Sequence, residues 1–194
     1  MKNKNQKTGF TLAEVLTTLS IIGVVAAIGI PMVMSKRPNN ELVLCKKAYY
    51  TVERIVSELV NDEDFYPQSR QDSLTLIGAP ANGSSTCAAG DGKFCCLFAE
   101  KLNIRGAAPT CTEGDNSVRA SDGITYTLPI TSFNAEASIS VDTNPNGVGS
   151  DASPDTFTFV VEPSGRIRVD DANAQAYLNT RDVTARTVAE AQEN

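Results

Sequence analysis

The sequence predicts an α+β protein in which a long N-terminal helix, apolar at first and amphipathic later, packs on a small antiparallel β-sheet. Three observations predict this fold. Residues 10–35 are almost wholly apolar, and residues 42–60 repeat apolar side chains at the three- and four-residue spacing of a helix. The alternating strand patterns all follow residue 121 and no long helix separates them, which favours antiparallel pairing.

Composition narrows the classes of function. The chain has 194 residues, a net charge of −6 and no histidine. The negative charge argues against nucleic-acid binding, because neutralising phosphates requires a basic face. The missing histidine removes Ser-His-Asp and Cys-His catalysis and HExxH zinc sites. We therefore expect no enzymatic activity and no required cofactor.

The N-terminal segment predicts a membrane span with a definite orientation. Residues 1–9 contain three lysines and no acid, and Glu14 is the only formal charge in residues 10–35. A helix of that length spans about 39 Å, more than the ~30 Å hydrocarbon core of a bilayer. The positive-inside rule leaves the N-terminus in the cytoplasm and places the rest of the chain outside.

Glu14 distinguishes this span from an ordinary signal peptide. The small residues Ala26, Ala27 and Gly29 would suit a signal-peptidase site, so that alternative stays open. A carboxylate in a span costs about 3 kcal/mol at the bilayer centre and less near the interface, so it needs a partner. The simpler alternative is an acid that only favours the helix dipole.

A motif spans residues 9–31. A short basic leader precedes Gly9, and the chain continues Phe10-Thr11-Leu12-Ala13-Glu14 and reaches a proline at position 31. This segment resembles the N-terminal signal of type IV pilins and type II secretion pseudopilins.

The resemblance implies a role for each residue of the motif. A prepilin peptidase would cut after Gly9 and methylate the new amine of Phe10. Glu14 would pair with the Phe10 amine of a neighbouring subunit, and Pro31 would loosen the helix during assembly. The implied partners are the prepilin peptidase, copies of this chain or other pilins in a helical filament, an inner-membrane assembly platform and membrane lipid.

The rest of the chain divides by composition. Pro38 interrupts the helical pattern, and we expect a kinked continuation; the alternative is a restart with Asn40 as N-cap. The predicted segments are a leader (1–9), a transmembrane assembly helix (10–35), its amphipathic continuation (36–61), a cysteine-containing loop-rich region (62–120), an antiparallel sheet with a candidate calcium loop (121–170) and a polar C-terminal helix or tail (171–194). Strands are expected at 124–130, 137–141, 156–161 and 166–169.

Four cysteines of the loop-rich region, Cys87, Cys95, Cys96 and Cys111, predict two disulfides, because an exported chain oxidises its thiols. A bond between the adjacent Cys95 and Cys96 would be strained, so each should pair with Cys87 or Cys111, in an order that the sequence leaves open. A zinc site is the alternative, although no CxxC pair is present. Cys45 is left over, on the amphipathic helix.

Oxygen ligands gather in residues 142–155, at Asp142, Asn144, Asn146, Asp151 and Asp155. An EF-hand is excluded because Ser153 stands where a bidentate glutamate is needed. The segment resembles a loop near the C-terminus of major pseudopilins, and relatives with this loop often bind calcium. The alternative is a solvated turn in which Asp and Asn bond their own backbone.

Two functions remain. The first is a structural pilin or pseudopilin in a type IV pilus or a type II secretion-type filament. The second is a membrane-anchored extracytoplasmic binding protein or adhesin that does not polymerise. Glu14 discriminates between them, because a plain anchor does not need it. An anchored hydrolase is disfavoured, since no nucleophile–base pair is evident.

Overall fold

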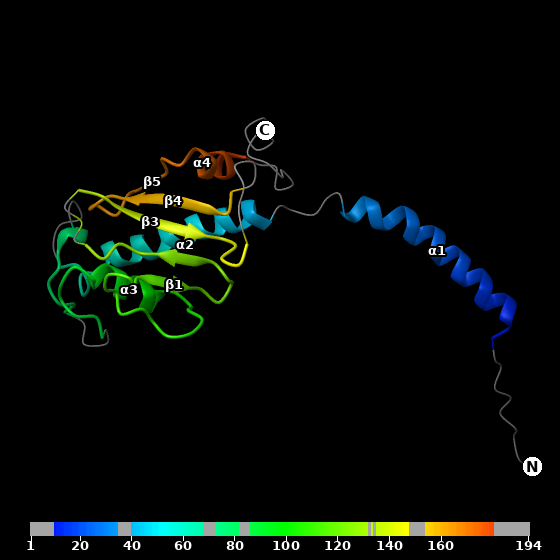
Figure 1. The fold of residues 1–194 in the computed structure, drawn as a ribbon, viewed down its shortest axis with the longest axis horizontal. Helices are drawn as coiled ribbons and strands as arrows, with labels where there is room; N and C mark the ends of the chain where they lie inside the picture. Colours follow the sequence, from blue (N-terminus) through cyan, green and yellow to red (C-terminus); the bar gives the residue numbers. More distant parts are fainter. Residues whose placement is uncertain are drawn as a thin grey trace, which may run out of the picture. The chain divides into compact units, whose positions relative to one another are not determined.

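A computed structural model describes residues 10–34, 40–67, 73–81, 86–131, 133, 135–147 and 154–180 of the chain (Figure 1). The chain divides into two compact units, residues 1–37 and residues 38–194. The first unit contains helix α1 (Leu12–Met34), and the second contains the remaining helices and one β-sheet. The predicted α+β class with an antiparallel sheet is confirmed.

Helix α2 (Asn40–Asn61) supplies the apolar face on which the second unit is built. Figure 1 shows α2 lying across one face of the sheet, and the Tyr49 ring meets Phe159 of strand β4 edge-on at 5.7 Å between centroids. The α2 residues that the second unit buries completely are Leu42, Cys45, Ala48, Val52, Ile55, Val56 and Leu59. Their three- and four-residue spacing puts them on one side of the helix, which explains why the helix forms on this surface.

In the sequence, Pro38 lies between α1 and α2. The expected kink at Pro38 lies outside the described residues. Asn40 is itself the first helical residue of α2 in the structure.

The sheet is a five-stranded antiparallel meander in the order β1-β2-β3-β4-β5. The strands are β1 (Ser117–Arg119), β2 (Thr125–Thr127), β3 (Ala137–Asp142), β4 (Thr156–Val161) and β5 (Ile167–Arg168). The central pair β3–β4 is the longest and places Ile139 opposite Phe159, both fully buried. Alternation therefore turns one set of large side chains toward α2.

Strand β2 is shorter than the expected 124–130. Pairing with β3 stops at Thr127, and the next residue, Leu128, bonds instead to Asn116, whose carbonyl and amide side chain both contact the Leu128 backbone. Pro129 then has no N–H to continue a ladder. Strand β1, on the other side of β2, is too short for its alternation to be visible in the sequence.

The region described above as loop-rich contains a helix that the sequence analysis missed. Helix α3 (Lys93–Lys101) buries Phe94, Leu97 and Phe98 and contacts α2, and the Phe98 ring lies 5.9 Å from the Tyr126 ring of β2. The spacing of these three residues is helical and was the available signal. The same region also holds a short 3-10 turn, η1 (Ser73–Thr75).

Lys93, the first residue of α3, contacts two residues that precede the helix in the sequence, Tyr66 and Leu76. Its side chain is only 3% exposed, and its ammonium group donates to the Leu76 carbonyl at 3.0 Å and lies 4.1 Å from the centroid of the Tyr66 ring. A carbonyl and an aromatic face replace part of the lost hydration. Burial lowers the pKa of Lys93 below its ordinary value.

The C-terminal part of the described chain is a helix rather than a tail. Helix α4 (Ala172–Asn179) begins at Asp171, whose Oδ1 accepts from the backbone N–H groups of Asn173 and Ala174 as an N-cap does. It contacts α2 and β4, and its Tyr177 ring is fully buried 5.7 Å from Phe157. Residues 181–194 of the predicted C-terminal segment lie outside the described residues.

Candidate functional site in the N-terminal helix

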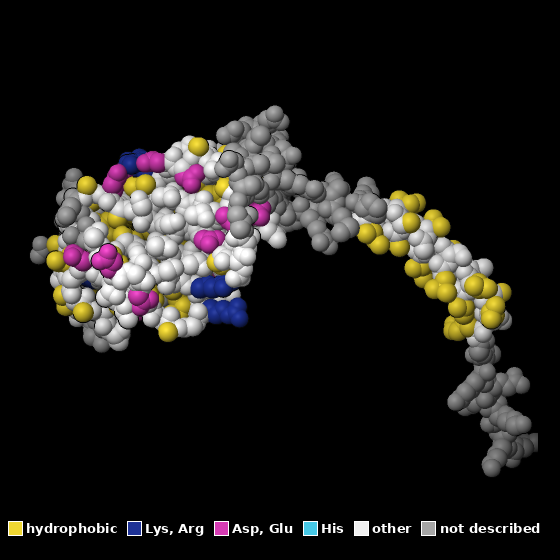
Figure 2. Space-filling model, in the orientation of Figure 1, with side chains coloured by type: hydrophobic (Ala, Val, Ile, Leu, Met, Phe, Trp, Pro, Cys, Tyr) yellow, Lys and Arg dark blue, Asp and Glu magenta, His cyan; other side chains and the backbone are white. Residues whose placement is uncertain are grey.

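Helix α1 is apolar around its whole circumference. Its segment Leu12–Ile30 has a mean hydropathy of 2.1 with no part of it buried, and within the described chain it is the one helix long and apolar enough to cross a membrane. In Figure 2, hydrophobic side chains are spread along the whole length of α1, with white backbone and other side chains between them. A helix that is hydrophobic on all sides is stable only when an apolar medium or other helices surround it.

The first turn of α1 is closed by a reciprocal pair of hydrogen bonds between Thr11 and Glu14. The Thr11 hydroxyl accepts from the Glu14 backbone N–H at 3.3 Å, and the Thr11 backbone N–H donates to Glu14 Oε2 at 2.8 Å. The Thr11 hydroxyl also donates to the same Oε2 at 2.8 Å. The arrangement is a capping box, which satisfies two N–H groups that a helix start leaves open.

The sequence Thr-x-x-Glu is the signal for this box. The partners expected for Glu14 from the sequence were the helix dipole and a neighbouring subunit. In the structure, the carboxylate of Glu14 accepts hydrogen bonds from Thr11, three residues before it in the same chain.

Of the other residues predicted for the motif, the structure describes Phe10 and Pro31 but not Gly9. Phe10 lies just before the capping residue and is 89% exposed, so its ring is free on the surface of the helix start. Phe10, Glu14, Val15 and Thr18 line a shallow groove along α1. Gly9, the expected cleavage residue, lies outside the described residues. Pro31 falls within α1, which continues to Met34.

Residues 4–30 match the family of the prokaryotic N-terminal methylation motif. This match covers residues 4–9 of the basic leader, the capped start of α1 and most of its apolar length. This match supports the resemblance of the N-terminal segment to type IV pilins and pseudopilins. Over 77 residues the chain is 27% identical to the type II secretion system core protein G of Pseudomonas aeruginosa. The alignment covers 40% of this chain and 54% of that protein, so the chain spans about half the length of the curated relative that it matches. No solved structure matches it.

The second unit contains the predicted disulfides. Cys87 is bonded to Cys96 and Cys95 to Cys111, so the two adjacent cysteines of α3 tie it to two different loops. The sulfurs that a zinc site would need are thus joined in pairs. Cys45 is free and fully buried on α2, and burial raises the pKa of its thiol to about 12.

The candidate calcium loop connects β3 to β4. Asp142 Oδ1 accepts from the Asn144 backbone N–H at 2.8 Å, and the Thr143 N–H and hydroxyl both donate to the Asp155 carbonyl, at 2.8 and 3.0 Å. These bonds bring the backbone at the two ends of the loop together. Asn146 belongs to the turn beyond Asn144, and Asp151 lies outside the described residues.

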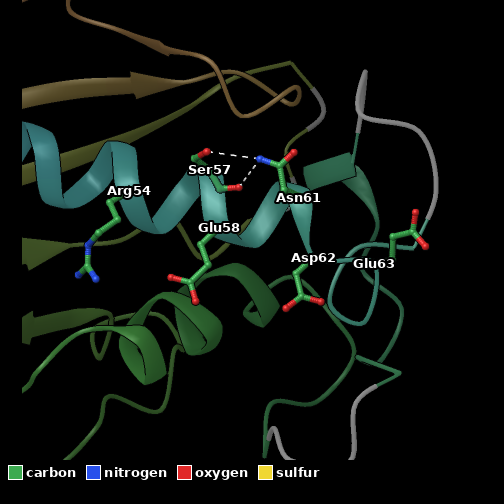
Figure 3. Close-up of a pocket in the computed structure, with 6 residues that line it drawn as sticks. All are labelled: Arg54, Ser57, Glu58, Asn61, Asp62 and Glu63. Atoms are coloured by element: carbon green, nitrogen blue, oxygen red, sulfur yellow. Dashed lines mark hydrogen bonds between the residues drawn. The ribbon is translucent and has the colours of Figure 1, made fainter.

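A shallow hollow lies at the C-terminal end of α2 (Figure 3). Its lining residues are Arg54, Ser57, Glu58, Asn61, Asp62 and Glu63. Three of their polar groups serve the fold itself: Asn61 donates to the Ser57 carbonyl at 2.7 Å, Glu58 pairs with Lys101, and Asp62 accepts from the Asp64 N–H. We assign no ligand to this hollow.

Proposed function

We propose that this chain is a structural subunit, a pilin or pseudopilin, of a type IV pilus or a type II secretion-type filament. It is inserted in the bacterial inner membrane with its N-terminus in the cytoplasm and its globular unit outside. A prepilin peptidase cuts after Gly9 and methylates the amine of Phe10. The subunit then joins a helical filament of itself or other pilins at an inner-membrane assembly platform. It has no catalytic role.

One observation carries the proposal: α1 is exposed and apolar on every side, and its only formal charge is the carboxylate of Glu14 in the first turn. An anchor that stays alone in lipid gains from this charge only the hydrogen bonds with Thr11 at the helix start, and it bears the desolvation cost of the carboxylate. A subunit that packs its α1 against other copies can place the carboxylate beside the new amine of a neighbour's Phe10, where both charges are compensated in a low-dielectric medium.

The assembly step is tested with Glu14→Ala in the full chain, expressed in a host that carries the filament machinery. We expect normal amounts of the variant in the membrane but a loss of at least ten-fold in the sheared filament fraction. Glu113→Ala, which removes an exposed acid of the globular unit, is the matched control and should assemble normally. Normal assembly of Glu14→Ala would favour the alternative, a non-polymerising membrane-anchored binding protein or adhesin.

The processing step is tested at the cleavage site. Replacing Gly9 with Val adds a branched side chain where the peptidase must approach the backbone closely. The uncleaved precursor should accumulate, whereas mass spectrometry of the wild-type filament fraction should find N-methylated Phe10 as the first residue. An unprocessed N-terminus in wild-type filaments would contradict this part of the proposal.

We also propose that the β3–β4 loop binds Ca²⁺ through Asp142, Asn144, Asn146, Asp151 and Asp155. The hydrogen bonds between Thr143 and Asp155 support this ligand set, because they hold the two ends of the loop together. Calcium should raise the melting temperature of the full chain in detergent, and magnesium should not. The proposal fails if calcium changes neither the melting temperature nor the protease resistance of the loop.

A further inference from the structure

Two arginines lie opposite each other at one margin of the sheet. A short segment after α3 runs antiparallel to the end of β1: Ile104 forms a bridge with Ala120, and the Arg105 N–H donates to the Arg119 carbonyl at 2.8 Å. This register places Arg105 directly opposite Arg119. Side chains that are directly opposite in an antiparallel pair point to the same face, with their Cβ atoms about 5 Å apart.

Neither of these arginines has a counter-ion in the described part of the chain. From the described residues, no hydrogen bond or ion pair reaches either guanidinium group, and the Nε atom of Arg119 is buried without a partner. By contrast, the guanidinium group of Arg168 reaches three carboxylates. An unsatisfied buried donor and two like charges on opposite strands both cost free energy. Contacts within the fold therefore do not explain why two arginines occupy these positions.

The surroundings of the pair supply a further donor. Arg119 follows the buried Val118, so alternation turns its side chain to the other face of the sheet. On that face its partner across β2 is Thr125, and the next carboxylate along the same row belongs to Asp142 of β3. Asp142 is two strands from Arg119, about 10 Å, and its Oδ1 already accepts from the Asn144 N–H. The arginine pair and the Thr125 hydroxyl thus lie together, with no carboxylate between them in this row.

We propose that Arg105 and Arg119 form a binding site for a phosphate monoester group. Together the two guanidinium groups carry two positive charges, and a phosphate monoester carries about −1.5 to −2 at neutral pH. One guanidinium fork occupies both oxygens of a carboxylate, whereas a phosphate group offers a third oxygen and can bond to both forks. The Thr125 hydroxyl is an additional donor. This site goes beyond filament assembly and does not rest on it.

A bound phosphate group removes both costs of the empty pair. Its charge offsets the repulsion between the two guanidinium groups, and its oxygens are acceptors for the Nε donor of Arg119. The chain as a whole has a net charge of −6 and repels anions at long range. Recognition therefore depends on the local pair, and because Arg105 is exposed, the affinity should fall as the salt concentration rises.

The test is a calorimetric titration of the full chain, in neutral detergent at low salt, with inorganic phosphate. We expect saturable binding that Arg105→Gln and Arg119→Gln each weaken at least ten-fold, the size expected for losing a bond to a charged group. Arg119→Lys keeps the charge without the planar fork and should be weakened as well. Arg166→Gln, which removes an exposed arginine from the turn before β5, is the matched control and should bind phosphate like the wild-type chain.

The melting temperature in phosphate-free buffer separates binding from folding. Arg105 is exposed, and its replacement relieves the repulsion, so Arg105→Gln should melt no lower than the wild-type chain. A lower melting temperature for this variant would show that the arginine serves the fold and would count against the site.

Three further ligands define the chemistry and its carrier. Acetate should bind at least ten-fold more weakly than phosphate. Tighter binding of glucose 1-phosphate than of dioctanoyl phosphatidic acid assigns the site to a phosphorylated sugar, the reverse order assigns it to a lipid headgroup, and equal binding assigns it to the phosphate group alone. The inference is overturned if the wild-type chain binds none of the phosphates, if acetate binds as tightly, or if Arg105→Gln and Arg119→Gln bind phosphate like Arg166→Gln.

Discussion

Gly165, in the turn between β4 and β5, packs directly against Val60 of α2: a Cβ at Gly165 would lie 2.5 Å from Val60 Cγ2. The glycine also has φ of +83°, a left-handed conformation that side chains disfavour. The turn can therefore approach the helix this closely only because residue 165 has no side chain.

Gly165→Ala should destabilise the fold through both effects. Gly123 is the matched control, because its φ is +96° but nothing lies within 4 Å of an added Cβ. We expect a loss in free energy of unfolding of about 1–2 kcal/mol for Gly123→Ala, from backbone strain alone. Gly165→Ala should cost about 1–3 kcal/mol more, from overpacking. Denaturant unfolding of the full chain in detergent measures both, and adding Val60→Ala should recover part of the Gly165→Ala loss but none of the Gly123→Ala loss.

Removing the Cys95–Cys111 disulfide should also destabilise the globular unit. The bond closes a loop with a sequence separation of 16, for which loop-closure entropy gives about 3 kcal/mol. The double variant Cys95→Ala/Cys111→Ala should lose about that amount in thermal unfolding. The Cys87→Ala/Cys96→Ala variant, with a separation of 9, is expected to lose slightly less. Two variants as stable as the wild-type chain would contradict this role of the bridges.

Helix α4 should control access to the one free thiol. Asp171 caps α4, which contacts α2, and the negative charge of Asp171 acts on the Cys45 thiol. Asp171→Ala should weaken α4 by about 1 kcal/mol, which raises the open population roughly five-fold. The rate of Cys45 modification by a thiol reagent under native conditions measures that opening. Asp170→Ala removes an adjacent acid that bonds Arg168 instead, and should leave the rate unchanged.

Alkaline pH should destabilise the fold through Cys45. Burial raises the pKa of this thiol to about 12, so the folded state keeps its proton after the unfolded thiol, with an ordinary pKa of 9.0, has lost it. This stabilisation is complete below pH 9 and is lost as the pH rises toward 12, at up to about 1.4 kcal/mol per pH unit. In the Cys45→Ala variant, the free energy of unfolding, measured by denaturant unfolding at each pH, should fall less between pH 9 and 10 than in the wild-type chain. Burial also raises the pKa of Tyr66 and of Tyr126. The wild-type chain and the Cys45→Ala variant should therefore both lose stability above pH 10.

Much of the fold could be predicted from the local sequence, because apolar residues recur there with the period of a helix or of a strand. The apolar stripe of α2 ends with the helix at Asn61, and the alternating run at 156–161 is strand β4. Helix α3 was missed because it is short and lies between two Gly-rich stretches, where turn residues outweighed the helical spacing of Phe94, Leu97 and Phe98. Strand β1 was missed because three residues show no period.

The sequence by itself determined the apolar span, its single acid and the set of cysteines available for bonding, since each is a property of residue type and spacing along the chain. Only the tertiary structure decided that Cys87 bonds Cys96 and Cys95 bonds Cys111, because α3 points its two adjacent cysteines at different loops. It also decided how Glu14 is held. Hydrogen bonds depend on which atoms meet at 2.8 Å, and here both donors of Thr11 meet the same oxygen.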